Sequence, residues 1–204
     1  MRQIGNSNSG RCVRLAFGSA ALVALLLVGL WFAFPHAAVR PPATRERAER
    51  DMVQNEGRWY AVGETNPYTG WMLDFYPGGA TLSRCQLTQG LLNGLSETWY
   101  TNGQLQVREY FKDGVSHGHR EKWHPNGARL SEATVVDGKV TGTFRSWYDN
   151  GQLCEQIELK LGRPNGTGFA YYPSGFLKAE TSVRDGQVLD RKSWEDGERK
   201  EMVE

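Results

Sequence analysis

Glycine, aromatic and polar positions recur every 24 residues through the last two-thirds of the chain. One column holds the glycines Gly79, Gly103, Gly127, Gly151 and Gly175. Two further glycine columns begin at Gly90 and Gly70. Two aromatic columns run beside each other: Phe75, Trp99, Trp123, Trp147 and Tyr171, then Tyr76, Tyr100, His124, Tyr148 and Tyr172. Columns that stay in phase without a gap indicate a stack of structural repeats.

The second repeat shows the structure that one unit predicts. Apolar and polar residues alternate in residues 104–112, the period of a half-buried strand, and residues 95–100 form a strand before them. Asn102-Gly103 between the two is a strong hairpin signal and predicts a type I′ turn. The fold class is therefore all-β, an elongated antiparallel β-meander of 24-residue hairpin repeats. Each repeat should lengthen the sheet by about 10 Å, two strand spacings.

The repeats set the expected domain boundaries. The repeat domain spans residues 58–197, and a charged tail, 198–204, comes after it. Arg58–Gly70 resembles an entering hairpin, and Arg191–Gly197 a closing strand. Such irregular ends are expected, because the terminal units of a repeat stack are usually atypical.

The N-terminal segment predicts a membrane anchor. A basic flank, residues 1–14, precedes residues 15–34, a run of 20 uncharged and mostly apolar residues. This is the length that crosses a hydrocarbon core of roughly 30 Å as a helix. A cleaved signal peptide is the main alternative, and a buried soluble helix is another. The run is longer than a usual signal-peptide core, however, and Phe34–Ala38 offers no good cleavage site. Residues 35–57 are expected to be a linker.

The orientation of this anchor is only weakly indicated by charge. Arginines flank the run on both sides, so the positive-inside rule does not favour one orientation clearly. A single N-terminal anchor generally exports the domain on its C-terminal side. The expected topology is therefore a single membrane crossing with the repeat domain on the extracytoplasmic side.

Charge argues against nucleic acid as a partner. Residues 1–50 carry seven Arg against two Glu, whereas residues 51–204 carry 17 Lys and Arg against 21 Asp and Glu. A mildly acidic body without a basic stripe does not fit a nucleic-acid-binding domain. The sequence also lacks the short motifs of phosphate-binding loops and nucleophile elbows. We therefore expect no enzyme activity, no cofactor and no small-molecule substrate.

A cluster of histidines is the only metal-like group in the sequence. His117, His119 and His124 lie close together with Glu121, and a His-x-His pair on one strand face can bind zinc. These histidines occupy ordinary repeat slots, so we expect no metal site. Cys85 and Cys154 belong to distant repeats and should lie too far apart for a disulfide.

The first aromatic column is the expected partner surface. A single-layer sheet cannot bury both faces, and a ladder of part-exposed rings is typical of a binding site. The alternative is that the rings are the sheet's own packing, and both can hold for one ladder. We expect this column to share the buried face with a fully apolar column. The ladder is Phe75, Trp99, Trp123, Trp147 and Tyr171; the apolar column is Leu87, Phe111, Val135, Leu159 and Val183.

The repeat motif carries a family resemblance. The motif W-Y-x-N-G-Q-L with a subsequent D-G-x-x-x-G, at Trp99–Gly118 and partly at Trp147–Leu153, resembles the variant MORN repeat of bacterial proteins. Many such proteins belong to the YwqK-type antitoxin family. The resemblance implies a binding protein, and we expect a membrane-anchored, non-enzymatic scaffold for a protein or peptide. It also implies that the membrane is a bacterial inner membrane, with the repeat domain in the periplasm. It leaves two alternatives, an antitoxin or immunity protein that neutralises a toxin and a structural protein of the cell envelope.

Overall fold

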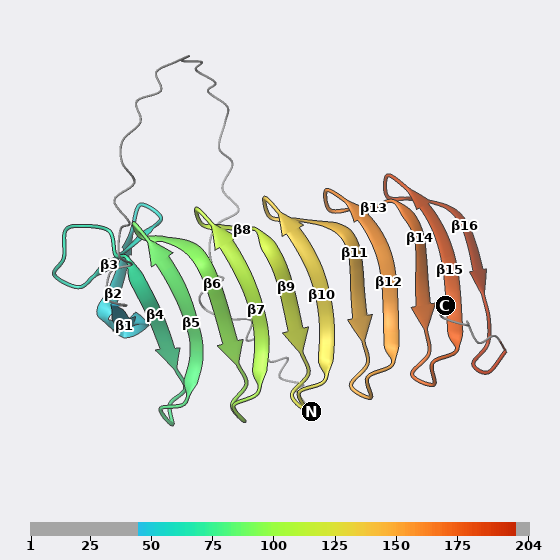
Figure 1. Ribbon diagram of the computed structural model, residues 1–204, viewed down its shortest axis with the longest axis horizontal. Helices are drawn as coiled ribbons and strands as arrows, with labels where there is room; N and C mark the ends of the chain where they lie inside the picture. Colours follow the sequence, from blue (N-terminus) through green and yellow to red (C-terminus); the bar gives the residue numbers. More distant parts are fainter. Residues whose placement is uncertain (1–44, 199–204) are drawn as a thin grey trace, which may run out of the picture.

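The computed structural model describes residues 45–198, and almost all of them belong to one long sheet (Figure 1). No α-helix occurs within this range, and none of its helices is long and apolar enough to cross a membrane. The expected anchor, residues 15–34, lies outside the described residues. The elements are β1 (Glu46–Ala48), η2 (Glu49–Asp51), β2 (Met52–Asn55), β3 (Arg58–Ala61), β4 (Gly70–Phe75), β5 (Thr81–Thr88), β6 (Leu91–Trp99), β7 (Leu105–Lys112), β8 (Val115–Ser116), β9 (Gly118–Trp123), β10 (Arg129–Val136), β11 (Lys139–Trp147), β12 (Leu153–Lys160), β13 (Arg163–Pro164), β14 (Gly166–Tyr171), β15 (Leu177–Arg184) and β16 (Gln187–Ser193).

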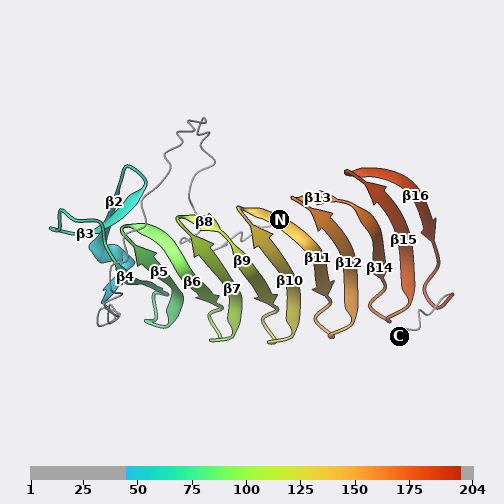
Figure 2. The ribbon, with the colours of Figure 1, turned by 45° about the horizontal axis from the view of Figure 1, so that its top comes forward.

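The large sheet has 14 strands, and from β4 to β16 each main strand pairs antiparallel with its neighbours in the chain. The predicted antiparallel meander of hairpins is thus confirmed. The strands curve in the same sense, as the two views show (Figures 1 and 2). β16 pairs with β15 and closes the array, as expected of the segment that breaks the repeat.

The sheet begins before the expected boundary at residue 58. β1 pairs with β4 in parallel, with Glu46 opposite Trp71. β2 and β3 form a separate hairpin at the β4 end of the sheet (Figure 2). β3 pairs with β2, so residues 46–55, expected to be linker, belong to the fold.

The two kinds of turn differ from each other, and one of them departs from the prediction. Asp113 and Gly114 both have positive φ, +50° and +84°, which is the type I′ geometry. At Asn102-Gly103 only the glycine does, and its amide donates to the Tyr100 carbonyl at 2.9 Å. This is a three-residue hairpin loop with a glycine bulge, so the predicted type I′ turn at Asn-Gly is wrong.

The asparagine of this loop serves a different purpose. Its Oδ1 accepts a hydrogen bond from the Gln104 amide at 3.0 Å, which holds the loop in shape. Its Nδ2 donates to the Pro125 carbonyl at 2.8 Å, in the corresponding turn of the next repeat. Asn126 and Asn150 make the same contact to Asp149 and Pro173. The Asn column therefore ties successive turns together.

Strand register divides the side chains between two faces. Residues opposite each other on paired strands share a face, and the register pairs Gly94 with Phe111 and Thr98 with Val107. Trp99 comes directly after Thr98, so its side chain lies on the other side. The expectation that the Trp column shares the face of Phe111 is therefore wrong. We name the two sides the Phe111 face (Ser96, Thr98, Val107, Glu109, Phe111) and the Trp99 face (Glu97, Trp99, Arg108, Glu121, Glu132, Arg145).

The second aromatic column links the repeats. The Tyr100 hydroxyl donates to the Trp123 carbonyl of the following repeat at 2.9 Å. Burial, together with the neighbouring Cys154 thiol, raises the pKa of Tyr148 to about 12, so this hydroxyl stays a donor at neutral pH. The same contact to the following repeat recurs at Tyr76, His124, Tyr148 and Tyr172. The column is thus a row of hydrogen-bonded links between hairpins.

The best-buried core lies under the β2–β3 hairpin. Met52 and Ala61 from that hairpin pack with Tyr68, Met72 and other residues of the first two repeats. Trp59 packs against this cluster, and its amide donates to the Gly90 carbonyl at 2.9 Å. The hairpin therefore covers one end of the Phe111 face and leaves the later repeats uncovered by any second layer within residues 45–198.

Candidate functional site

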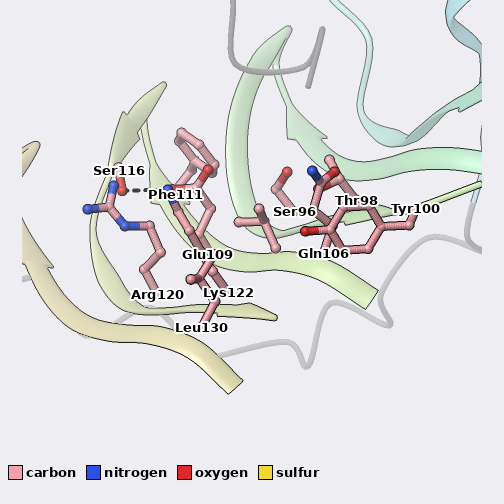
Figure 3. Close-up of a pocket in the computed structure, with 11 residues that line it drawn as sticks. Ser96, Thr98, Tyr100, Gln106, Glu109, Phe111, Ser116, Arg120, Lys122 and Leu130 are labelled. Carbon is pink, nitrogen blue, oxygen red and sulfur yellow. Dashed lines mark hydrogen bonds between the residues drawn. The ribbon is translucent and has the colours of Figure 1, made fainter. Parts of the chain in front are cut away.

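A cavity of about 340 Å³ opens on the Phe111 face between the second and third repeats (Figure 3). Its apolar wall includes Val107, Phe111 and Leu130. Its polar wall comes mainly from β6, β7 and β9, which lie side by side, and Ser116 of the short strand β8 completes it. The polar lining residues are Ser96, Thr98, Tyr100, Gln106, Glu109, Ser116, Arg120 and Lys122.

Glu109 is the buried charge of this cavity, with 6% of its surface exposed. It accepts a hydrogen bond from the Ser116 hydroxyl at 3.2 Å. Burial raises the pKa of the Glu109 carboxyl, and the cations Arg120 and Lys122 oppose that shift, as does the Ser116 hydrogen bond. Burial therefore disfavours the ionised carboxylate, and the two nearby positive charges partly offset this effect.

Three polar groups of the cavity lack a hydrogen-bond partner among residues 45–198. The Thr98 hydroxyl is one, although Thr98 is only 4% exposed. Arg120 and Lys122 make no hydrogen bond and no ion pair within 4.0 Å in the same range, and interact with Glu109 only through their charges. Buried polar groups in native proteins are normally satisfied, so the buried Thr98 hydroxyl needs an explanation, whereas Arg120 and Lys122 are half-buried cations that make no ion pair in this range.

The cavity also departs from the repeat. The positions equivalent to Glu109 hold Cys85, Ala133, Ile157 and Thr181. The positions equivalent to Arg120 hold Met72, Ser96, Phe144 and Gly168. Uncharged side chains therefore satisfy the fold at both places, and the charged pair is specific to this repeat. Sequence reasoning missed this site, although the mismatch with the other repeats was visible in the printed sequence.

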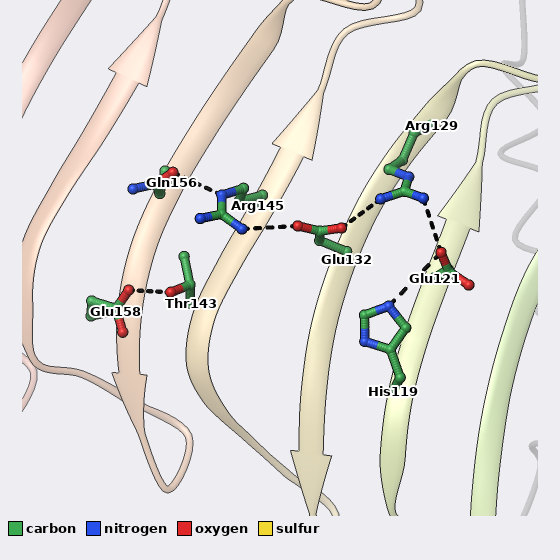
Figure 4. Close-up of polar contacts among 8 residues, drawn as sticks. All are labelled: His119, Glu121, Arg129, Glu132, Thr143, Arg145, Gln156 and Glu158. Carbon is green, nitrogen blue, oxygen red and sulfur yellow. Dashed lines mark hydrogen bonds and ion pairs between the residues drawn. The ribbon is translucent and has the colours of Figure 1, made fainter. Parts of the chain in front are cut away.

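The Trp99 face is built differently. The Glu97 carboxylate lies between two guanidinium groups, at 2.9 Å from Arg108 and 3.3 Å from Arg84. Farther along, a chain of contacts joins neighbouring strands (Figure 4). Arg129 reaches Glu121 at 3.1 Å and Glu132 at 2.6 Å; Arg145 reaches Glu132 at 3.0 Å and Gln156 at 2.8 Å. The charged groups of this face are thus paired with one another, although Arg84 Nε is buried without a hydrogen-bond partner among residues 45–198.

The predicted aromatic ladder lies along this second face. Phe75 is 41% exposed, whereas Tyr171 is buried at 7% and the three tryptophans are half-buried. Guanidinium groups cover two of the rings. Arg108 lies 5.9 Å from the Trp123 ring centre, and Arg129 lies 5.7 Å from that of Trp147. Since the same arginines are held by carboxylates, the Trp123 and Trp147 rings pack against side chains of the sheet itself.

The turn glycines of the first column share one conformation. Gly79, Gly103, Gly127, Gly151 and Gly175 have φ between +83° and +87°. L-residues with a Cβ avoid this region, which explains why glycine recurs there. These residues shape the turns and lie outside the cavity.

The histidines contact separate partners. His117 Nδ1 lies 3.3 Å from Asp137 Oδ1, and His124 Nε2 lies 2.9 Å from the Trp147 carbonyl. His119 Nε2 lies 3.8 Å from Glu121 Oε1. No group of three metal-ligating side chains forms within residues 45–198. Cys85 and Cys154 lie on β5 and β12, with β6, β7, β9, β10 and β11 between them.

Two hairpins of the sheet match a known family. Residues 92–113 and 140–160 match the MORN repeat variant. These two hairpins are therefore similar to MORN-type repeats. Each match covers nearly one whole hairpin, β6–β7 in the first case and β11–β12 in the second. No curated protein matches the chain. MORN repeats are generally interaction repeats for proteins or membranes, and their family is not an enzymatic one.

Proposed function

We propose that this protein is a non-enzymatic interaction scaffold whose MORN-type repeats bind a protein or peptide partner on the Phe111 face. The observation that carries the proposal is the cavity between β6, β7, β9 and β10, with the unsatisfied Thr98 hydroxyl and the cations Arg120 and Lys122 on its wall. Concave sites with a mostly apolar wall and a few convergent polar groups are the usual form of a binding pocket. General use of MORN repeats in interactions supports the same conclusion.

The Trp99 face offers a partner fewer unpaired charged groups than the Phe111 face does. Its arginines and carboxylates are already paired, so a partner docking there would have to break existing contacts. Paired charges that become desolvated at an interface gain little net affinity. On the Phe111 face a partner would instead supply hydrogen bonds that Thr98, Arg120 and Lys122 lack. The difference favours the Phe111 face as the docking side.

Membrane attachment is a second part of the proposal. The uncharged run at residues 15–34 would hold the scaffold at a membrane, and its length supports a spanning helix. N-terminal sequencing of the protein isolated from its own cells tests this directly. A retained anchor leaves the original N-terminus in place, whereas a mature start near Ala38 would show that the segment is cleaved.

Two matched variants test the docking side. Gln106→Trp adds a large ring to the cavity wall. Thr134→Trp adds the same ring at an exposed position on the Trp99 face, opposite His119. Partners are crosslinked to the full-length protein in its own membranes and captured, with circular dichroism as the control for folding. We expect Gln106→Trp to lose the partner and Thr134→Trp to keep it. Loss with Thr134→Trp alone would overturn the proposal.

A further inference from the structure

We infer that the cavity on the Phe111 face binds a carboxylate that sits next to an apolar side chain in an extended segment of the partner. The inference rests on the proposed function and names the chemistry that the site recognises. Three features carry it: the placement of the donors, the charge balance of the cavity, and its apolar wall. The charged residues among them, Glu109 and Arg120, replace uncharged residues of the other repeats, so the fold itself does not require their charges.

The donors lie in two neighbouring rows across three strands. One row is Thr98, Val107 and Lys122, opposite one another on β6, β7 and β9. Since strands are spaced about 4.8 Å apart, Thr98 and Lys122 flank Val107 with backbones about 10 Å apart. A group lying over Val107 can therefore take a hydrogen bond from each side. Arg120 lies two residues before Lys122 on the same face, beside Glu109 (Figure 3).

The charge balance favours a single negative charge. Arg120 and Lys122 bring two positive charges, and Glu109 brings one negative charge when it is ionised. The surplus of one positive charge matches one carboxylate. A cationic ligand would face both unpaired cations, and a doubly charged anion would be repelled by Glu109. Hydrogen bonds between ionised donors and acceptors are about twice as strong as neutral ones.

The apolar wall specifies the group that accompanies the carboxylate. Phe111 is 8% exposed and Leu130 is half-buried, and both line the cavity with Val107. A cavity of about 340 Å³ holds a side chain of the size of Leu or Phe beside the carboxylate. An Asp or Glu next to an aliphatic or aromatic residue in an extended peptide presents both groups together.

Glu109 limits the negative charge that the cavity accepts. When a ligand carboxylate enters, it shares the positive charges of Arg120 and Lys122 with Glu109, and the two carboxylates repel each other. Ionised Glu109 therefore weakens the binding of one carboxylate and disfavours a second. Ser116, Arg120 and Lys122 are the groups that face Glu109.

The test uses two capped peptides on the full-length protein in detergent. The probe is acetyl-Leu-Glu-Phe-amide, and its control is acetyl-Leu-Gln-Phe-amide, which has the same shape without the charge. Titrations followed by saturation-transfer NMR give the dissociation constants. We expect the Glu peptide to bind about tenfold more tightly than the Gln peptide, the effect of one charge-assisted hydrogen bond. Equal binding of the two peptides would overturn the inference.

Variants assign the effect to the cavity. Lys122→Gln and Arg120→Gln should each remove most of the preference for the Glu peptide. Glu109→Gln should strengthen it at pH 7, because a like charge is removed while the shape is kept. Arg108→Gln is the matched control, since Arg108 neighbours Glu109 in the chain but lies on the Trp99 face. A loss with Arg108→Gln as large as that with Lys122→Gln would contradict the assignment.

The outcomes separate this inference from the proposed function. If both peptides bind equally and Gln106→Trp still loses the partner, the Phe111 face remains the docking side but the proposed carboxylate recognition is wrong. If the Glu peptide binds more tightly but Gln106→Trp still captures the partner, the cavity binds a carboxylate but the proposed docking of the partner on the Phe111 face is wrong.

Discussion

The two faces of this sheet are made from the same hairpins but differ in how their charged and aromatic side chains are arranged. On the Trp99 face, rings lie under guanidinium groups that are themselves held by carboxylates on neighbouring strands. On the Phe111 face, small and apolar side chains pack closely until the second and third repeats, where Glu109, Arg120 and Lys122 interrupt them. The comparison shows that half-buried aromatic rings can be covered by the sheet's own guanidinium groups. Buried groups without a hydrogen-bond partner among residues 45–198 occur on both faces, Thr98 Oγ1 on one and Arg84 Nε on the other. The cations Arg120 and Lys122, which make no ion pair in that range, are therefore what distinguishes the Phe111 face.

The largest expected effect compares two rings on opposite faces of one repeat junction. Phe111→Ala should cost about 3–5 kcal/mol of the free energy of unfolding, the range for a buried Phe. Trp123→Ala should cost less, despite its larger ring, because Trp123 is half-buried whereas Phe111 is 8% exposed. Urea denaturation followed by circular dichroism measures both. A larger loss for Trp123→Ala would mean that the Trp99 face is the main core.

A smaller effect is expected from the links between repeats. Tyr100→Phe removes the hydroxyl that donates to the Trp123 carbonyl and keeps the ring. The loss should be about 1 kcal/mol, the usual net value of one hydrogen bond. Tyr110→Phe is the control: Tyr110 is 42% exposed, and its hydroxyl makes no hydrogen bond within residues 45–198. Equal effects in the two variants would show that the Tyr column does not link the repeats.

The third effect depends on pH. Because burial raises the pKa of Glu109 above its ordinary 4.5, the folded protein binds this proton more tightly than the unfolded chain does. The group therefore favours the folded state most below pH 4.5 and progressively less as the pH rises through the raised pKa. Wild type should gain stability relative to Glu109→Gln when denaturation is repeated between pH 7 and pH 4. A stability difference between the two proteins that stays constant from pH 7 to pH 4 would contradict the claim that burial disfavours the ionised Glu109 carboxylate.

Periodic glycines allowed most of the fold to be predicted. A glycine with positive φ at each turn is a local requirement, so it is written in the sequence at every repeat. The parallel pairing of β1 with β4 could not be predicted in this way, because Glu46–Ala48 is short, carries two charges and depends on a distant partner strand. The same holds for the β2–β3 hairpin over the core, whose strands show no clear alternation.

The choice of face could have been predicted better than it was. A two-residue loop at Asn102-Gly103 and the bulged loop observed there both pair Thr98 with Val107. Either loop therefore sets Trp99 on the side opposite Phe111. The binding cavity was harder to predict, because Glu109, Arg120 and Lys122 come from two strands whose register must be known first. Their mismatch with the other repeats was the available signal.

Site-specific photocrosslinking tests the central claim, that partners dock on the Phe111 face, most directly. The photoreactive residue p-benzoyl-phenylalanine is placed at Gln106, on the cavity wall, and separately at Thr134, exposed on the Trp99 face. Both proteins are irradiated in their own cells, and crosslinked products are separated by mass. A partner crosslinked from Gln106 and not from Thr134 is the predicted result. A partner crosslinked from Thr134 alone would contradict the claim and return the binding side to the aromatic ladder.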